Sequence, residues 1–103
     1  MMSNIYYNPD HFGLEIVAEL DLNDVPYQFD MVIVWKDTVE KLWWAGDDGC
    51  SCPSPFEDMG LADLNPLPET IVQLKEHVSH GNFADVSAFF RAVMPVLGWK
   101  EIE

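Results

Sequence analysis

Basic residues are scarce in this chain. Its 103 residues contain five Lys and Arg against 18 Asp and Glu, which gives a formal net charge of −13. Such a charge repels nucleic acids and anionic membrane surfaces and attracts basic partners. The composition therefore argues against direct binding of DNA or RNA. Acidic side chains also keep small proteins soluble, so the charge by itself does not specify a function.

Long apolar runs and cysteines are scarce as well. No stretch approaches the roughly 20 apolar residues that a membrane-spanning helix needs. Residues 1–7 lack the basic start and apolar middle of a secretory signal. The two cysteines, Cys50 and Cys52, lie in one loop and form no disulfide framework. We expect a cytoplasmic protein with reduced thiols and no membrane contact.

Hydrophobic residues, in contrast, are plentiful. They make up 49% of the chain, and aromatic residues make up 13%. This share is enough to fill a modest core and is far above that of a disordered chain. No internal repeat and no Gly/Ser linker interrupts the sequence. We therefore expect residues 1–103 to form a single domain.

The first half of the chain has the pattern of β-strands. Apolar and polar residues alternate over about 14–21 and 26–36, and a third strand is expected over about 41–46. Turns at residues 23–24 and 37–40 predict an antiparallel meander. The expected cross-strand pairs are Leu20 with Tyr27, Ala18 with Phe29, Trp35 with Leu42, and Ile33 with Trp44.

The second half of the chain has the pattern of two helices. Apolar residues recur at helical spacing over about 67–80 and 83–94. Gly81 is a natural C-terminal stop for the first helix, Asn82 can cap the second, and Pro95 should end or kink it. The sequence thus predicts an α+β fold in which a three-stranded antiparallel β-meander is followed by an αα-hairpin packed on one sheet face.

The outer face of the predicted sheet is the main candidate for function. In the expected register it displays an apolar strip beside carboxylates, made of Val17, Val32, Val34, Trp43, Glu15, Glu19 and Asp30. One interpretation is a protein interface, in which the strip supplies desolvation and the carboxylates select a basic partner. The other is that Tyr6, Tyr7, Phe12 or the loop after the third strand covers the strip. A homodimer through this face is possible, although carboxylates would then approach one another.

The second candidate is the loop over residues 47–58. Its glycines permit unusual dihedral angles and its prolines fix φ, so we expect a rigid segment despite its lack of regular structure. The residues expected to shape it are Gly49, Cys50, Cys52, Pro53, Pro55, Phe56 and Glu57.

A zinc site is the sharpest chemical alternative. Cys50 and Cys52 with His77 and His80 could complete a tetrahedral Cys₂His₂ set, although both spacings are shorter than usual. The other interpretation is that the thiols pack under the prolines and the histidines are ordinary polar residues at a helix end. A Cys-x-Cys redox pair would close a strained ring and has no nearby basic residue to lower a thiol pKa. We therefore predict no metal and no cofactor.

The loop also carries a family resemblance. The run from Asp48 to Asp58, with its Gly-Cys-Ser-Cys-Pro-Ser-Pro-Phe-Glu core, resembles the signature of small uncharacterised proteins from phages of actinobacteria. The early Tyr6-Tyr7-Asn8-Pro9 run is similar to the N-terminal portion of that family. The resemblance covers about the first two-thirds of the chain. It implies a viral protein from a bacteriophage, present in the cytoplasm of the host cell, and it implies no particular activity.

No motif of an enzyme is present in the sequence. It contains no phosphate loop, no nucleophile elbow, no Ser/His/Asp pattern and no calcium-loop spacing. We expect a non-enzymatic binding protein that contacts a basic host or phage protein through its acidic sheet face. Alternatives are the zinc-stabilised accessory protein and a DNA mimic that inhibits a nucleic-acid-binding protein. Mimicry requires carboxylates with little apolar surface between them, which the predicted valine strip does not provide.

Overall fold

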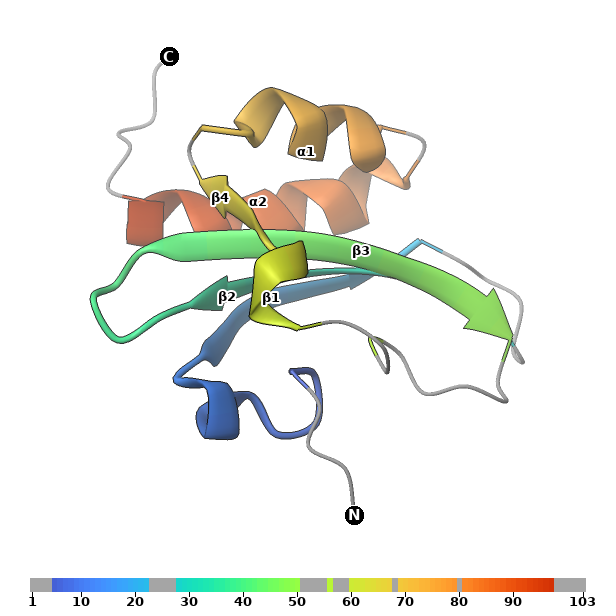
Figure 1. Cartoon of the computed structure of the whole chain (residues 1–103). Coiled ribbons are helices and arrows are strands. Elements are labelled where there is room, and N and C mark those ends of the chain that lie inside the picture. The colour runs from blue at the N-terminus through green and yellow to red at the C-terminus, as the bar shows by residue number, and fades with distance from the viewer. Residues whose placement is uncertain are drawn as a thin grey trace.

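A computed structural model of the chain describes residues 5–22, 28–50, 56, 60–67, 69–79 and 81–97. The fold is α+β, with a four-stranded antiparallel sheet in the order β1-β2-β3-β4 and two helices (Figure 1). The elements are the 3₁₀-helix η1 (Pro9–Phe12), β1 (Glu15–Asp21), β2 (Gln28–Lys36), β3 (Leu42–Cys50), the 3₁₀-helix η2 (Leu61–Asp63), β4 (Asn65–Leu67), α1 (Ile71–His77) and α2 (Phe83–Leu97). The predicted class is confirmed, and the sheet has one short strand more than predicted.

Both faces of the sheet are covered. The helices pack on one face, and the N-terminal segment with η1 lies on the other (Figure 1). The helix-side core contains Ala18, Leu20, Val32, Val34, Leu42, Trp44, Leu67, Leu74, Val78, Phe89 and Val93. The opposite core contains Ile5, Leu14, Met31, Ile33, Trp35, Ala45, Phe56 and Leu64. Residues 31–35 are consequently all buried, because β2 lies between two apolar layers.

The predicted register between β2 and β3 is wrong by one residue. Trp35 pairs with Trp43 and Val34 with Trp44, so the side chains of β2 fall on the faces opposite to those expected. Leu42 and Trp44 of β3 keep the expected face, which the helices cover. The turn explains the slip. The loop is closed by the bond from the Asp37 N–H to the Lys41 carbonyl oxygen, and Glu40 has a left-handed φ of 67°. The loop therefore has three residues, 38–40, whereas the predicted pairing of Trp35 with Leu42 leaves a two-residue loop at 38–39.

The register between β1 and β2 also differs from the prediction. Leu20 pairs with Val32 and Ala18 with Val34, and a bulge lies between Ile16 and Ala18. The shift places Val32 and Val34 on the same face as Ala18 and Leu20, where the helices cover them. The predicted turn at residues 23–24, together with Tyr27, lies outside the described residues.

The third strand is longer than expected. β3 continues to Cys50, so Asp47 and Asp48 pair with β2 and do not belong to a loop. Phe56 is fully buried with a φ of 62°, and its N–H donates to Asp47 Oδ2 over 2.8 Å. This bond fixes the backbone at a bulky residue in a conformation that such residues seldom adopt. Cys52, Pro53, Pro55 and Glu57 lie outside the described residues.

The helices differ from the prediction at their ends. Leu67, the predicted start of the first helix, lies in β4 (Asn65–Leu67), and α1 begins only at Ile71. Asn82 caps α2 as predicted, because its Oδ1 accepts from the N–H groups of Ala84 and Asp85 over 2.8 and 3.3 Å. Pro95 does not end α2 and lies inside it.

Candidate functional site

The strip predicted on the outer face does not form one surface. Val32 and Val34 are fully buried under the helices, and half-buried Val17 packs against the same core. Trp43 belongs to the other side of the sheet, where it packs against the opposite core. The slipped register is the reason, because it turns the valines of β2 inward and separates them from Trp43.

The carboxylates of that prediction remain at the surface of β1. Glu15 is exposed and lies 3.8 Å from Lys36 Nζ. Glu19 is exposed and accepts a hydrogen bond of 2.6 Å from the Tyr6 hydroxyl. Burial, together with this bond to a carboxylate, raises the pKa of Tyr6 above its usual range, so Tyr6 stays a donor at neutral pH. Asp30 is half-buried, and its N–H donates to Asp21 Oδ1 over 3.4 Å.

Acidic residues from two layers meet at the edge of β1. A hollow of about 350 Å³ runs between residues 18–21 of β1 and one face of α2. Glu19 and Asp21 border it from the strand, and Asp85 borders it from the first turn of the helix. Its remaining lining residues are mostly small: Ala18, Leu20, Ala88, Phe89 and Ala92. We call this hollow with its three carboxylates the acidic edge.

Sequence reasoning found only part of the acidic edge. It identified Glu19 as a candidate and assigned no binding role to Asp85. The pair Ala88 and Ala92, both exposed, could have indicated this face of α2 from the sequence. Two alanines four residues apart lie on one face of a helix and let another chain approach closely.

A second and smaller hollow surrounds Trp43. It has a volume of about 220 Å³ and is lined by Phe12, Gly13, Leu14, Asp37, Thr38, Trp43, Leu61 and Leu64. Asp37 Oδ2 accepts the indole N–H of Trp43 over 2.9 Å, and its Oδ1 accepts the N–H groups of Val39 and Lys41. The Trp43 bond, followed by the two backbone bonds, lowers the pKa of Asp37 below its ordinary value of 3.8. Asp37 therefore organises the hairpin and holds Trp43 in place.

Asp37→Ala should lower the free energy of unfolding by about 1 kcal/mol at pH 7, because hydrogen bonds in the turn are lost. On acidification the unfolded chain takes up the proton before the folded chain does, since the folded-state pKa is the lower one. The stabilisation by Asp37 is thus complete above about pH 5 and disappears as the pH falls through the folded-state pKa. Urea unfolding at pH 7 and pH 3 checks this. A difference in free energy of unfolding between wild type and variant that is the same at both pH values would contradict this prediction.

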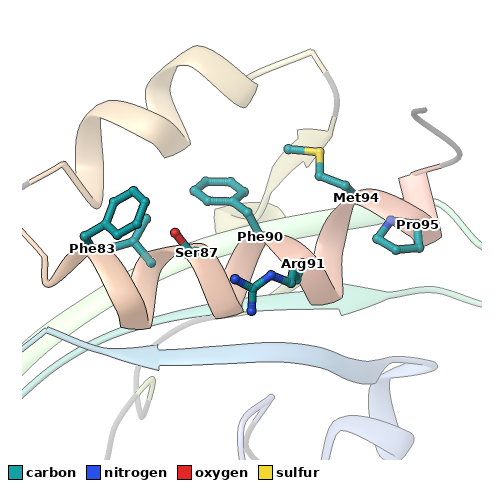
Figure 2. Close-up of a pocket in the computed structure, with 7 residues that line it drawn as sticks. Phe83, Ser87, Phe90, Arg91, Met94 and Pro95 are labelled. Atoms are coloured by element: carbon teal, nitrogen blue, oxygen red, sulfur yellow. The ribbon is translucent and has the colours of Figure 1, made fainter. Parts of the chain in front are cut away.

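A third and larger hollow lies along α2. Figure 2 shows Phe83, Phe90 and Met94 on this helix beside Ser87 and Arg91. The hollow has a volume of about 580 Å³. Phe83 is 86% exposed, whereas Phe90 also packs against the helix-side core. Arg91, the only arginine of the chain, makes this face the least acidic of the three.

The zinc alternative rests mostly on side chains outside the described residues, namely those of Cys50, Cys52 and His80. Its fourth member, His77, lies with its ring 5.6 Å from the ring of Trp44. His77 also covers Gly46, where an added Cβ would come within 2.6 Å of its Nε2. Among the described residues, no three His, Cys, Asp or Glu side chains are placed to hold a metal ion. The contacts of His77 are those of a side chain packed on β3.

Within the part of the chain that the structure describes, no helix is long and apolar enough to cross a membrane.

Comparison with known proteins places the chain in a family. No curated protein and no solved structure matches it. The model of a domain of unknown function, DUF7574, matches residues 3–97, which include every helix and strand that the structure describes. The chain therefore belongs to the DUF7574 family.

Proposed function

We propose that the chain is a non-enzymatic binding protein that captures a basic partner protein at the acidic edge. The main support for this is the hollow between β1 and α2, which Glu19 and Asp21 border from the strand and Asp85 borders from the helix, beside small and apolar side chains. Such a site combines desolvation with charge selection, which is how protein interfaces choose basic partners. The net charge of −13 adds long-range attraction.

The site still recognises a basic partner through carboxylates, but it lies at the acidic edge and not on the outer face of the sheet. Of the residues predicted for this site, Glu19 alone borders the hollow. The other lining residues of the hollow replace Glu15, Val17, Asp30, Val32, Val34 and Trp43. The resemblance to actinobacteriophage proteins makes a host or phage protein in the host cytoplasm the natural partner. Binding needs no metal or cofactor.

A charge-matched pair of variants tests the proposal. The first carries Glu19→Gln, Asp21→Asn and Asp85→Asn. The second carries Asp10→Asn, Glu40→Gln and Glu76→Gln, which remove three exposed carboxylates that do not border the hollow. The probe is a hexapeptide of alternating lysine and valine, with its affinity measured by calorimetry at several salt concentrations.

We expect the first variant to bind the peptide about ten-fold more weakly than wild type, with a shallower salt dependence. The second variant should stay within about two-fold of wild type, because distant exposed charges are largely screened. Equal losses in both variants would mean that the peptide responds only to total charge, and the proposal would then be wrong.

A DNA mimic is the second candidate. Val32 and Val34, which separated the carboxylates in the predicted register, are buried, so Glu15 and Glu19 lie at the surface without these two valines between them. This removes the main argument against mimicry. Competition separates the two candidates: a captured partner that duplex DNA displaces supports the mimic, and a partner that DNA leaves bound supports ordinary protein recognition.

A further inference from the structure

We propose that the partner segment binds at the acidic edge as an added β-strand, with its backbone hydrogen-bonded to the outer edge of β1. This inference rests on the proposed function and specifies how the partner is held. Strand addition requires three features: an edge strand whose backbone groups point outward, room beside it, and side chains that select the incoming segment.

The first feature follows from the hydrogen bonds at the two ends of β2. The Leu22 N–H donates to the Asp30 carbonyl oxygen over 2.7 Å, and the Asp37 N–H donates to the Lys41 carbonyl oxygen over 3.0 Å. Because bonding alternates along an antiparallel strand, even-numbered residues of β2 bond to β1 and odd-numbered residues bond to β3.

The same alternation fixes the direction of the backbone groups in β1. Leu20 and Ala18 face Val32 and Val34, which are even-numbered, so their N–H and C=O groups bond to β2. Glu19 faces Ile33, which bonds to β3. The N–H and C=O of Glu19 therefore point away from β2, towards the open edge of the sheet. No described strand pairs with that side of β1.

Room for an added strand is present at the same place. The hollow borders four consecutive residues of β1, residues 18–21, which correspond to about 13 Å of extended chain. On its helix side, Ala88 and Ala92 present only methyl groups. The bulge between Ile16 and Ala18 interrupts the edge just before the hollow, so pairing is confined to a short segment.

The side chains define the chemistry of the segment. Glu19 lies opposite Ile33 and thus points to the face of the opposite core, whereas Asp85 comes from the helix side. The face of the added strand beside Glu19 and Asp21 therefore favours lysine or arginine. The face towards α2 favours small apolar residues, which fit against Ala88 and Ala92 near Asp85.

A second copy of this chain is a poor occupant. Pairing two β1 edges would bring the carboxylates of both copies together across the two-fold axis, and each copy carries a net charge of −13. A foreign basic segment meets no such repulsion.

Two peptides of equal charge test the inference on the unaltered protein. One is the alternating lysine–valine hexapeptide. The other has the same sequence with N-methyl groups on its two adjacent central residues, which removes one donor from each edge of the extended chain. We expect methylation to weaken binding by about ten-fold, because backbone pairing is lost while charge is kept. Saturation with the first peptide should slow hydrogen exchange of the Glu19 amide by about ten-fold, since this N–H gains an acceptor.

Equal affinity for the two peptides, with unchanged exchange at Glu19, would refute strand addition. If the Glu19/Asp21/Asp85 variant still binds both more weakly than the charge-matched control does, the proposed function stands without this mode. If neither peptide distinguishes those variants, the proposed function fails and the inference fails with it. Concentration-dependent dimerisation that protects the Glu19 amide without peptide would identify a second copy as the occupant and overturn the inference.

Discussion

Val34→Lys should unfold the protein or lower its free energy of unfolding by more than about 4 kcal/mol, because the ammonium group would lie in the helix-side core without a partner. Val34 is fully buried and belongs to a cluster with Ala18, Leu20, Phe89 and Val93. The register expected from the sequence places Val34 on the outer face, where lysine would be tolerated if no other segment covered that face.

Val39→Lys is the matched control for this experiment. Val39 is 78% exposed at the turn between β2 and β3, so the same substitution there should change the free energy of unfolding by no more than about 0.5 kcal/mol. Urea unfolding followed by circular dichroism measures both. Two equally stable variants would show that the helices do not cover this face of β2.

Trp35→Ala should lower the free energy of unfolding by about 4 kcal/mol or more, which is a large part of the stability of a small domain. Trp35 is fully buried in the opposite core, where its ring meets that of Phe56 edge to face at 5.5 Å. Its indole N–H donates to the Ile5 carbonyl oxygen over 2.8 Å and ties the N-terminal segment to the sheet. The substitution therefore leaves a cavity and an unsatisfied carbonyl group together.

Trp35→Phe separates these two contributions. It keeps an aromatic ring against Phe56 and removes the donor to Ile5. We therefore expect its free energy of unfolding to lie between those of wild type and Trp35→Ala. Denaturant midpoints of the three proteins give the order. A Trp35→Ala protein as stable as wild type would contradict the packing of the N-terminal segment on β2.

The location of the candidate site was less predictable than its chemistry. The acidic character of β1 follows from Glu15, Glu19 and Asp21, whose alternation with apolar residues is visible in the sequence. Their neighbours could not be predicted in this way. Asp85 is 64 residues beyond Asp21 in the chain, and only the packing of α2 against β1 places both at one hollow.

The run of five apolar residues in β2 already indicated that both faces of this strand are buried. Residues 31–35 are all hydrophobic, which is typical of a strand buried on both sides. An exposed outer face that includes Val32 and Val34 does not agree with this pattern. The segments that cover the second face are short and irregular, and they include Ile5 and Phe56, so no periodic pattern indicated them.

The sequence by itself determined the α+β class, the approximate position of three strands and two helices, and the cap of α2 at Asn82, because these depend on local periodicity and hydrogen bonding. The tertiary structure alone decided which side of β2 faces the helices. That choice depended on one extra residue in the turn at Glu40 and on the bulge in β1, and a slip of one residue reverses every face of a strand. The valines consequently lie in the core, and the carboxylates of β1 border the hollow beside α2.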